Sequence, residues 1–234
     1  MEEIIKLNAF VSWSGGKDGA LSYYRAMKNF HVTHLLNMVA ENVQISRSDV
    51  IRTGVLVLQA EAMDLTIVQP TSSWETYEAE FKRALSGLKD KGIEVCIFGD
   101  IDFEEHREWV ERVSRESGLE AVLPLWGEKN RENLIKELIE TGFKAVVVAT
   151  KKNLLGPEWL GRRIDRDFVW DISKIKGVDI SGEKGEYHTL VISGPIFKKR
   201  INILKSEKVS RGEHSFLDIL ECELAENVAG APTD

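Results

Sequence analysis

The sequence of 234 residues predicts an α/β protein, with a doubly wound, mostly parallel sheet followed by a small C-terminal α+β domain. Two observations support this fold class. Short apolar runs alternate with stretches of helical periodicity up to Thr150, which is the pattern of parallel strands joined by helical crossovers. After Thr150, glycine, proline and charged residues interrupt this pattern before further strands follow. We therefore expect domains over residues 1–150 and 151–226, with a flexible tail over residues 227–234.

The elements follow from hydrophobic periodicity. Apolar runs predict strands in the first domain over residues 8–13, 34–40, 65–69, 94–98, 120–123 and 144–149. Helical spacing predicts helices over residues 18–29, 48–63, 74–90, 104–117 and 129–141. The run 144–149 is almost purely apolar, as expected for a strand of a parallel sheet that is covered on both faces. In the second domain we expect a helix over about residues 165–174 and strands over residues 187–192, 199–205 and 215–224.

Composition excludes several classes of protein. The net charge of −7 argues against broad, non-specific binding of nucleic acid. Cys96 and Cys222 are far apart and form no CxxC pair, so neither a zinc site nor a disulfide framework is indicated. The acidic start Met1-Glu2-Glu3 does not resemble a signal peptide, and no apolar run approaches the roughly 18 residues of a membrane span. We expect a cytoplasmic protein without a nucleic-acid or membrane partner.

The segment from Ser14 to Gly19 has the features of an anion site, because it joins a predicted buried strand to a predicted helix. Gly15 and Gly16 lack a Cβ atom, so their backbone can approach a ligand closely. The first amides of a helix lack partners within the helix, and the helix dipole favours negative charge there. Lys17 adds a cation, and Asp18 could hold a Mg²⁺ ion that bridges phosphates. The alternative is an ordinary turn with a solvated Lys-Asp pair.

Other loops are expected at the same edge of the sheet, because ligands bind beyond the carboxyl ends of parallel strands. Asn42 and Gln44 follow the second predicted strand, Gly99 and Asp100 follow the fourth, and residues 124–127 follow the fifth. We expect these loops to line one cleft.

A second informative stretch is Gly182-Glu183-Lys184-Gly185-Glu186-Tyr187-His188-Thr189, just before an apolar run. Its glycines allow a tight turn, its carboxylates could orient an amine or a metal, and His188 could take a proton near neutral pH. The alternative is a charged hairpin turn with a solvated histidine.

The residues from Ser14 to Asp18 resemble the PP-loop, Ser-Gly-Gly-x-Asp-Ser, of the N-type ATP pyrophosphatases, with Gly19 in place of its second serine. They do not match a Walker A motif. Four further segments, together with residues 182–189, resemble the diphthine–ammonia ligase family in order along the chain: residues 98–101, 124–127, 159–162 and 194–198. Residues 45–55 depart from the family pattern, since they lack its aromatic–histidine segment.

This resemblance implies a PP-loop fold and ATP-dependent amidation. A carboxylate is activated as an acyl-adenylate, pyrophosphate leaves, and ammonia displaces AMP. In the best-known members the carboxylate belongs to diphthine, a modified histidine on elongation factor 2. The implied ligands are therefore ATP, Mg²⁺, ammonium and a carboxylate acceptor.

The resemblance also implies roles for individual residues. The expected catalytic residues are Lys17, Asp18, Glu183, Glu186 and His188, of which the last three would position substrate or ammonia. The expected nucleotide-binding residues are Ser12, Ser14, Gly15, Gly16, Lys17, Asp18, Gly19, Val39, Gly99, Asp100 and Arg162. Asp18 and Asp100 are the expected metal ligands. Asp100 could instead cap the helix that begins near Glu104, and Arg162 could be a surface charge.

Three other functions remain open at this stage. The enzyme could amidate a different, small-molecule carboxylate. Base modification of tRNA is disfavoured by the acidic balance and by the absence of CxxC pairs and an appended RNA-binding module. A nucleotide-binding protein without turnover is suggested only by Gly19. The sequence also allows a homo-oligomer.

Overall fold

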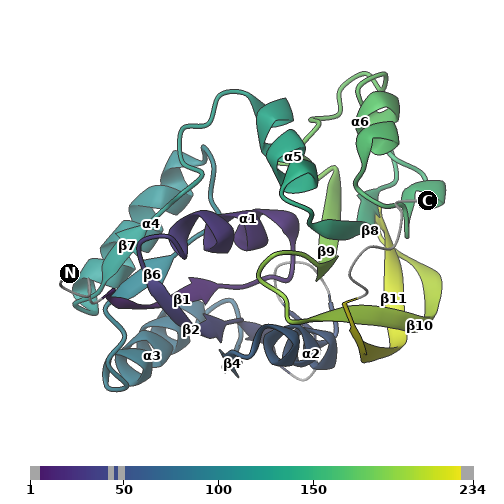
Figure 1. Ribbon diagram of the computed structural model, residues 1–234. Helices are drawn as coiled ribbons and strands as arrows, with labels where there is room; N and C mark the ends of the chain where they lie inside the picture. The colour runs from purple at the N-terminus through teal and green to yellow at the C-terminus, as the bar shows by residue number, and fades with distance from the viewer. Residues whose placement is uncertain (1–5, 42–44, 47–50, 228–234) are drawn as a thin grey trace, which may run out of the picture.

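A parallel sheet of five strands forms the first half of the computed structural model, which describes residues 6–41, 45–46 and 51–227 (Figure 1). Its strand order is β4-β2-β1-β6-β7. The strands are β1 (Asn8–Ser12), β2 (His31–Leu36), β4 (Thr66–Val68), β6 (Val95–Ile97) and β7 (Glu120–Val122). The central strand β1 pairs in parallel with both β2 and β6, so its carboxyl end lies at the middle of the sheet.

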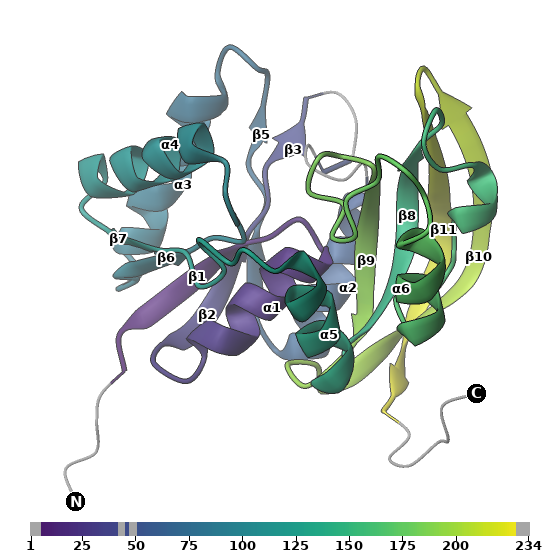
Figure 2. The same cartoon turned by 90° about the horizontal axis from the view of Figure 1, so that it is seen from above.

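Helices cover both faces of this sheet (Figure 2). They are α1 (Lys17–Ala26), α2 (Thr53–Met63), α3 (Tyr77–Lys89), α4 (Glu104–Glu116) and α5 (Arg131–Glu140). In β1, Ala9 and Val11 pack into the core shared with α1, α2 and α5, whereas Phe10 packs into the core shared with α3 and α4. Burial on both faces explains the uninterrupted apolar run of this strand. The doubly wound parallel sheet predicted from the sequence is confirmed.

The second sheet is antiparallel and has the order β10-β11-β8-β9. Its strands are β8 (Lys144–Lys151), β9 (Tyr187–Ser193), β10 (Lys199–Arg211) and β11 (His214–Glu226). The expectation that residues 144–149 complete the parallel sheet is therefore wrong. An apolar run indicates burial on both faces but carries no information on strand direction, and the partners of β8 come later in the chain. The predicted division into domains at residue 150 stays a prediction.

The predicted strand over residues 34–40 is also wrong in part. The strand β2 ends at Leu36, and the short β3 (Val39–Ala40) pairs instead with β5 (Thr71–Ser72) in a separate ribbon. Asn37 lies at the break, where its side-chain amide donates hydrogen bonds to the backbone oxygen of Trp13 (2.8 Å) and to the Ser46 hydroxyl (2.9 Å). Predicted loop residues Asn42 and Gln44 lie outside the described residues.

The remaining elements are a 3-10 turn, η1 (Pro157–Trp159), and a short helix, α6 (Arg166–Ile172), which lie between β8 and β9. Among the described residues, no helix combines the length and the apolar character that crossing a bilayer requires. Most of the predicted tail, residues 228–234, lies outside the described part of the chain.

Candidate active site

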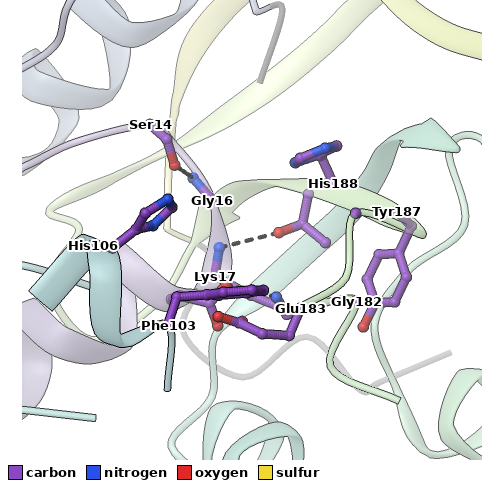
Figure 3. Close-up of a pocket in the computed structure, with 12 residues that line it drawn as sticks. Ser14, Gly16, Lys17, Phe103, His106, Gly182, Glu183, Tyr187 and His188 are labelled. Atoms are coloured by element: carbon purple, nitrogen blue, oxygen red, sulfur yellow. Dashed lines mark hydrogen bonds and ion pairs between the residues drawn. The ribbon is translucent and has the colours of Figure 1, made fainter. Parts of the chain in front are cut away.

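A pocket of about 210 Å³ lies where the carboxyl end of the parallel sheet meets the antiparallel sheet (Figure 3). Its lining comes from the turn after β1, the start of α4, the loop before β9 and the first residues of β9. The lining residues are Ser14, Gly16, Lys17, Asp18, Phe103, His106, Gly182, Glu183, Gly185, Tyr187, His188 and Thr189. Two segments that the sequence analysis singled out, far apart in the chain, therefore face each other across one cavity.

The turn over residues 14–19, here called the phosphate turn, depends on Gly15. Its φ of +91° lies in the left-handed region, and a Cβ atom there would lie 2.6 Å from Leu56 Cδ2. Glycine is therefore required by both conformation and space. Gly16 precedes the first helical residue of α1, and its amide donates to the Ser14 hydroxyl at 3.3 Å. The first amides of α1 consequently lie beside the pocket, as an anion site requires.

The phosphate turn is held by β9 and α2. The Val191 amide donates to the Gly15 oxygen at 2.9 Å, and the Lys17 amide donates to Thr189 Oγ1 at 3.0 Å. Gln59 of α2 donates through its side-chain amide to the backbone oxygens of Gly15 (3.1 Å) and Val191 (2.6 Å). The conformation of the turn thus depends on both halves of the chain.

Lys17 is buried, with 5% of its surface exposed. Its Nζ atom lies 2.7 Å from Asp18 Oδ2 and 5.6 Å from the centre of the Tyr187 ring. Lys17 is therefore not the solvated residue that the alternative of an ordinary turn required. A buried cation at a helix N-terminus gives this end of the pocket the charge needed to bind a phosphate.

Asp100 does not cap α4, since Phe103 is the N-cap residue and makes no side-chain capping bond. Instead Asp100 Oδ1 lies 3.2 Å from His106 Nδ1. Burial raises the pKa of Asp100 above its ordinary value, the charge of Asp18 raises it further, and His106 opposes both. Asp100 and Asp18 are thus electrostatic neighbours.

Close packing at Gly99 brings this segment against α1. A Cβ atom on Gly99 would lie 3.0 Å from the backbone nitrogen of Gly19.

The described residues contain no cluster of three or more His, Cys, Asp or Glu side chains that could hold a metal. Mg²⁺ in phosphate-transfer sites commonly takes one or two carboxylates together with substrate phosphates. The pair Asp18 and Asp100 fits such an ion.

The loop over residues 179–186, here called the acidic loop, contains two glutamates with different environments. Glu186 is 1% exposed, and its oxygens accept the backbone amides of Asp179 (2.8 Å) and Lys184 (3.0 Å). Glu183 instead lines the pocket. Burial raises the pKa of Glu183 to about 7, helped by the charge of Asp18 and opposed by that of Lys17. Glu186 shapes the loop, and Glu183 is the carboxylate that the loop presents to the pocket.

Only some of the predicted site residues line the pocket: Ser14, Gly16, Lys17, Asp18, Glu183 and His188. Five others do not line the pocket but contact the segments that form it: Gly15, Gly19, Gly99, Asp100 and Glu186. The three remaining predicted residues are also not pocket-lining residues: Ser12, Val39 and Arg162. Arg162 pairs with Asp171 at 2.6 Å and lies over the Trp159 ring at 4.7 Å, so its predicted contact with a phosphate or carboxylate has no support in this geometry.

Several residues at the site were missed by the sequence analysis. Phe103 and His106 line the pocket from the start of α4. The sequence predicts a helix shortly after Gly99, so residues at the start of that helix could have been expected near the pocket. His106 is 68% exposed, as expected of a solvated histidine, yet it also contacts Asp100. Arg131 carried no motif. Its Nη1 atom lies 4.0 Å from Glu183 Oε2, and its guanidinium forms an ion pair with Asp102.

Comparisons with known proteins agree with this arrangement in two halves. A model of the diphthamide synthase N-terminal domain matches residues 7–121, and one of the diphthamide synthase C-terminal domain matches residues 130–224. Relatives named diphthine–ammonia ligase include the protein of Rattus norvegicus, 26% identical over 94% of this chain and 94% of the relative. The protein of Homo sapiens is 27% identical over 94% of this chain and 93% of the relative.

Among solved structures, the chain is similar to one described as a predicted subunit of tRNA methyltransferase from Methanocaldococcus jannaschii. The sequences are 16% identical, the TM-score is 0.44, and the match covers 81% of this chain and 98% of the other.

Proposed function

The chain belongs to the diphthamide synthase family, and on this premise we propose that it is an ATP-dependent, AMP-forming amide ligase with diphthine as its acceptor. Ammonium is the proposed nitrogen source. The observation that carries the proposal is the buried Lys17 at the N-terminus of α1, which faces the acidic loop across a single pocket.

The phosphate turn is proposed to bind the β and γ phosphates of ATP. The Lys17 ammonium group and the N-terminal dipole of α1 neutralise charge that develops on pyrophosphate as it leaves, which is electrostatic rather than covalent catalysis. Mg²⁺, when bound, supplies further neutralisation of the phosphates, and Asp18 with Asp100 would hold it. No nucleophilic side chain is required, because the acceptor carboxylate itself attacks the α phosphorus.

The second half of the pocket is proposed to receive the acceptor and ammonium. Glu183 comes from the acidic loop, and His188 comes from the start of β9. Glu186 is a positioning residue that holds this segment through backbone amides. Phe103 and His106 line the same pocket from the start of α4, so they are proposed to contact the side chain of the acceptor.

The test is an incubation of the purified protein with Mg²⁺, ATP labelled at the α phosphate, ammonium and a panel of acceptors that includes diphthine-bearing elongation factor 2. AMP and pyrophosphate formed only with diphthine support the proposal. AMP formed only with another carboxylate keeps the amide ligase and discards diphthine. Tight ATP binding without AMP from any acceptor would indicate a nucleotide-binding protein without turnover. ADP as the product would overturn the assignment.

A further inference from the structure

We infer that Glu183 binds the incoming ammonium ion and accepts its proton, so that free ammonia is generated beside the acyl-adenylate. This inference rests on the proposed function and assigns its second half-reaction to one side chain. Figure 3 shows Glu183 entering the pocket from the acidic loop, on the side of Lys17.

Charge matching supports this assignment. ATP and the acceptor carboxylate are both anionic, and the phosphate turn supplies them with Lys17 and helix amides. A partly buried carboxylate in the same pocket would repel either anion. Ammonium is cationic and carries only hydrogen-bond donors, whereas an ionised carboxylate carries only acceptors. Glu183 therefore suits ammonium better than it suits the other two substrates.

Hydrogen bonding distinguishes Glu183 from neighbouring carboxylates. Asp18 is paired with Lys17 at 2.7 Å, and Glu186 accepts two backbone amides. Within the described part of the chain, the structure gives Glu183 no hydrogen bond, although its side chain is only 15% exposed. Its ion pair with Arg131 spans 4.0 Å. A poorly solvated carboxylate with open acceptor sites is stabilised by a ligand that donates to it.

The charges that face Glu183 come from three elements. Lys17 and Asp18 lie at the start of α1, Arg131 lies at the start of α5, and Asp102 precedes α4. Burial and the two aspartates raise the pKa of Glu183, and the two cations lower it, with a result of about 7. A carboxylate with this pKa is a far better proton acceptor at neutral pH than an ordinary exposed glutamate.

The proposed step conserves atoms and charge. One N–H bond of ammonium breaks, and its proton moves to a Glu183 carboxylate oxygen. The lone pair that is freed on nitrogen attacks the carbonyl carbon of the acyl-adenylate. The bond from that carbon to the AMP oxygen then breaks, AMP leaves, and nitrogen releases a second proton to solvent as the amide forms. No oxidant, reductant or additional co-reactant is needed.

The two half-reactions can be measured separately. Acceptor-dependent exchange of labelled pyrophosphate into ATP, without ammonium, reports adenylation alone. The variant E183Q is expected to keep this exchange within about twofold of the wild type, which also shows that it is folded. Its amide formation from ammonium is expected to fall ~10²- to 10⁴-fold, the usual contribution of a positioned proton acceptor.

Hydroxylamine provides the decisive comparison, because it is largely unprotonated at pH 7 whereas ammonia is almost entirely ammonium. E183Q is expected to form the hydroxamate from hydroxylamine at close to the wild-type rate. The ratio of wild-type to E183Q rates with ammonium is expected to fall as pH rises above about 7, because Glu183 is then ionised in the wild type while the free ammonia on which E183Q depends keeps increasing. The variant E183D, which keeps a carboxylate, is expected to restore part of the ammonium-dependent rate.

Two matched variants serve as controls. E213Q changes an exposed glutamate of the same half of the chain and is expected to leave both half-reactions unchanged. E186Q perturbs the acidic loop and is expected to reduce the rates with ammonium and hydroxylamine equally. Such equal losses in E183Q would assign Glu183 a merely structural role.

Other outcomes would also overturn the inference. Full ammonium-dependent activity in E183Q would do so directly. If E183Q needs a higher concentration of Mg²⁺ for half-maximal pyrophosphate exchange, Glu183 binds the metal instead. If E183Q needs a higher concentration of the acceptor, Glu183 binds the acceptor instead. Absence of exchange in the wild type with every acceptor would instead refute the proposed function, so the two failures are distinguishable.

Discussion

The two sides of the pocket are built on different principles. The phosphate turn is recognisable from its own sequence, yet distant residues hold it in place: Gln59 from α2 and Thr189 and Val191 from β9. The acidic loop largely holds itself, because Glu186 accepts amides from within it. The turn therefore couples the two sheets, whereas the loop is a local scaffold that presents one carboxylate.

The two sides of the pocket also differ in how far their charges are compensated. Lys17 is neutralised by its neighbour Asp18, so the buried cation is compensated before any ligand binds. Glu183 of the acidic loop has its pKa raised to about 7, and its ion pair with Arg131 spans 4.0 Å, while Arg131 also pairs with Asp102. Burying a charge without compensation is costly. The charge of Lys17 is thus compensated before ATP binds, whereas the carboxylate of Glu183 is stabilised most by a ligand that donates hydrogen bonds to it.

The largest expected effect comes from removing the cation of the phosphate turn. Lys17→Met keeps much of the side-chain volume but leaves Asp18 without its partner and the departing pyrophosphate without a positive charge. We expect AMP formation to fall ~10²- to 10³-fold, the typical cost of losing one such stabilising group. The measurement is release of labelled AMP, with thermal unfolding followed by circular dichroism to show that the variant is folded.

Lys136→Met is the matched control, because Lys136 lies on α5 with 67% of its side chain exposed. It is expected to leave turnover unchanged. Turnover of Lys17→Met within a few-fold of the wild type would contradict the assignment of residues 14–19 as the phosphate site.

The sequence predicted the phosphate turn well because its determinants are local. Glycines, a lysine and an aspartate between a strand and a helix restrict the conformation and the charge together. The same pattern could not reveal Gln59, since a buried glutamine within an apolar helix has no spacing signature. Arg131 was missed for a similar reason, because only the fold brings the start of α5 beside Glu183.

The acidic loop shows the opposite limit of sequence analysis. Glu183 and Glu186 belong to one motif, and nothing in their spacing predicts different roles for them. Their roles differ because Glu186 reaches backbone amides while Glu183 reaches the pocket. The strand over residues 144–149 was misassigned to the parallel sheet because its partners, β9 and β11, come later in the chain.

Stability as a function of pH should separate the two glutamates. In the fold the pKa of Glu183 is raised from 4.5 to about 7, so its ionised form destabilises the folded protein. The free energy of unfolding is therefore expected to fall as pH rises from about 4.5 to about 7, and Glu183→Gln is expected to remove this part of the fall. The measurement is urea unfolding at pH 5 and pH 8, without nucleotide or Mg²⁺.

Glu186→Gln is the comparison within the same loop. Its amide group replaces one acceptor oxygen that faces a backbone N–H, so the free energy of unfolding should decrease by about 1–3 kcal/mol at both pH values. Equal effects of the two substitutions at both pH values would show that the two carboxylates share one structural role.

The smallest expected effect concerns Gly19, where the phosphate turn departs from the PP-loop pattern. A Cβ atom at Gly19 would lie 3.6 Å from Trp13 Cε3 and 3.7 Å from the Ser12 backbone oxygen, which are ordinary contacts. Gly19→Ser should therefore fold normally, with a slight gain in stability because serine favours a helix more than glycine does. We expect AMP formation to rise a few-fold, because the hydroxyl adds a donor near the departing pyrophosphate.

Gly99→Ala tests a different contact of Gly19, the one with the segment that follows β6. Its Cβ atom would lie 3.0 Å from the backbone nitrogen of Gly19 and 3.2 Å from the carbonyl carbon of Asp18, so the start of α1 must shift. We expect a loss of about 1–3 kcal/mol in the free energy of unfolding, together with slower AMP formation. Kinetics and urea unfolding of both variants check the pair. A Gly19→Ser protein as destabilised as Gly99→Ala would mean that the turn requires glycine at residue 19, and that its missing serine reflects packing rather than weaker binding of pyrophosphate.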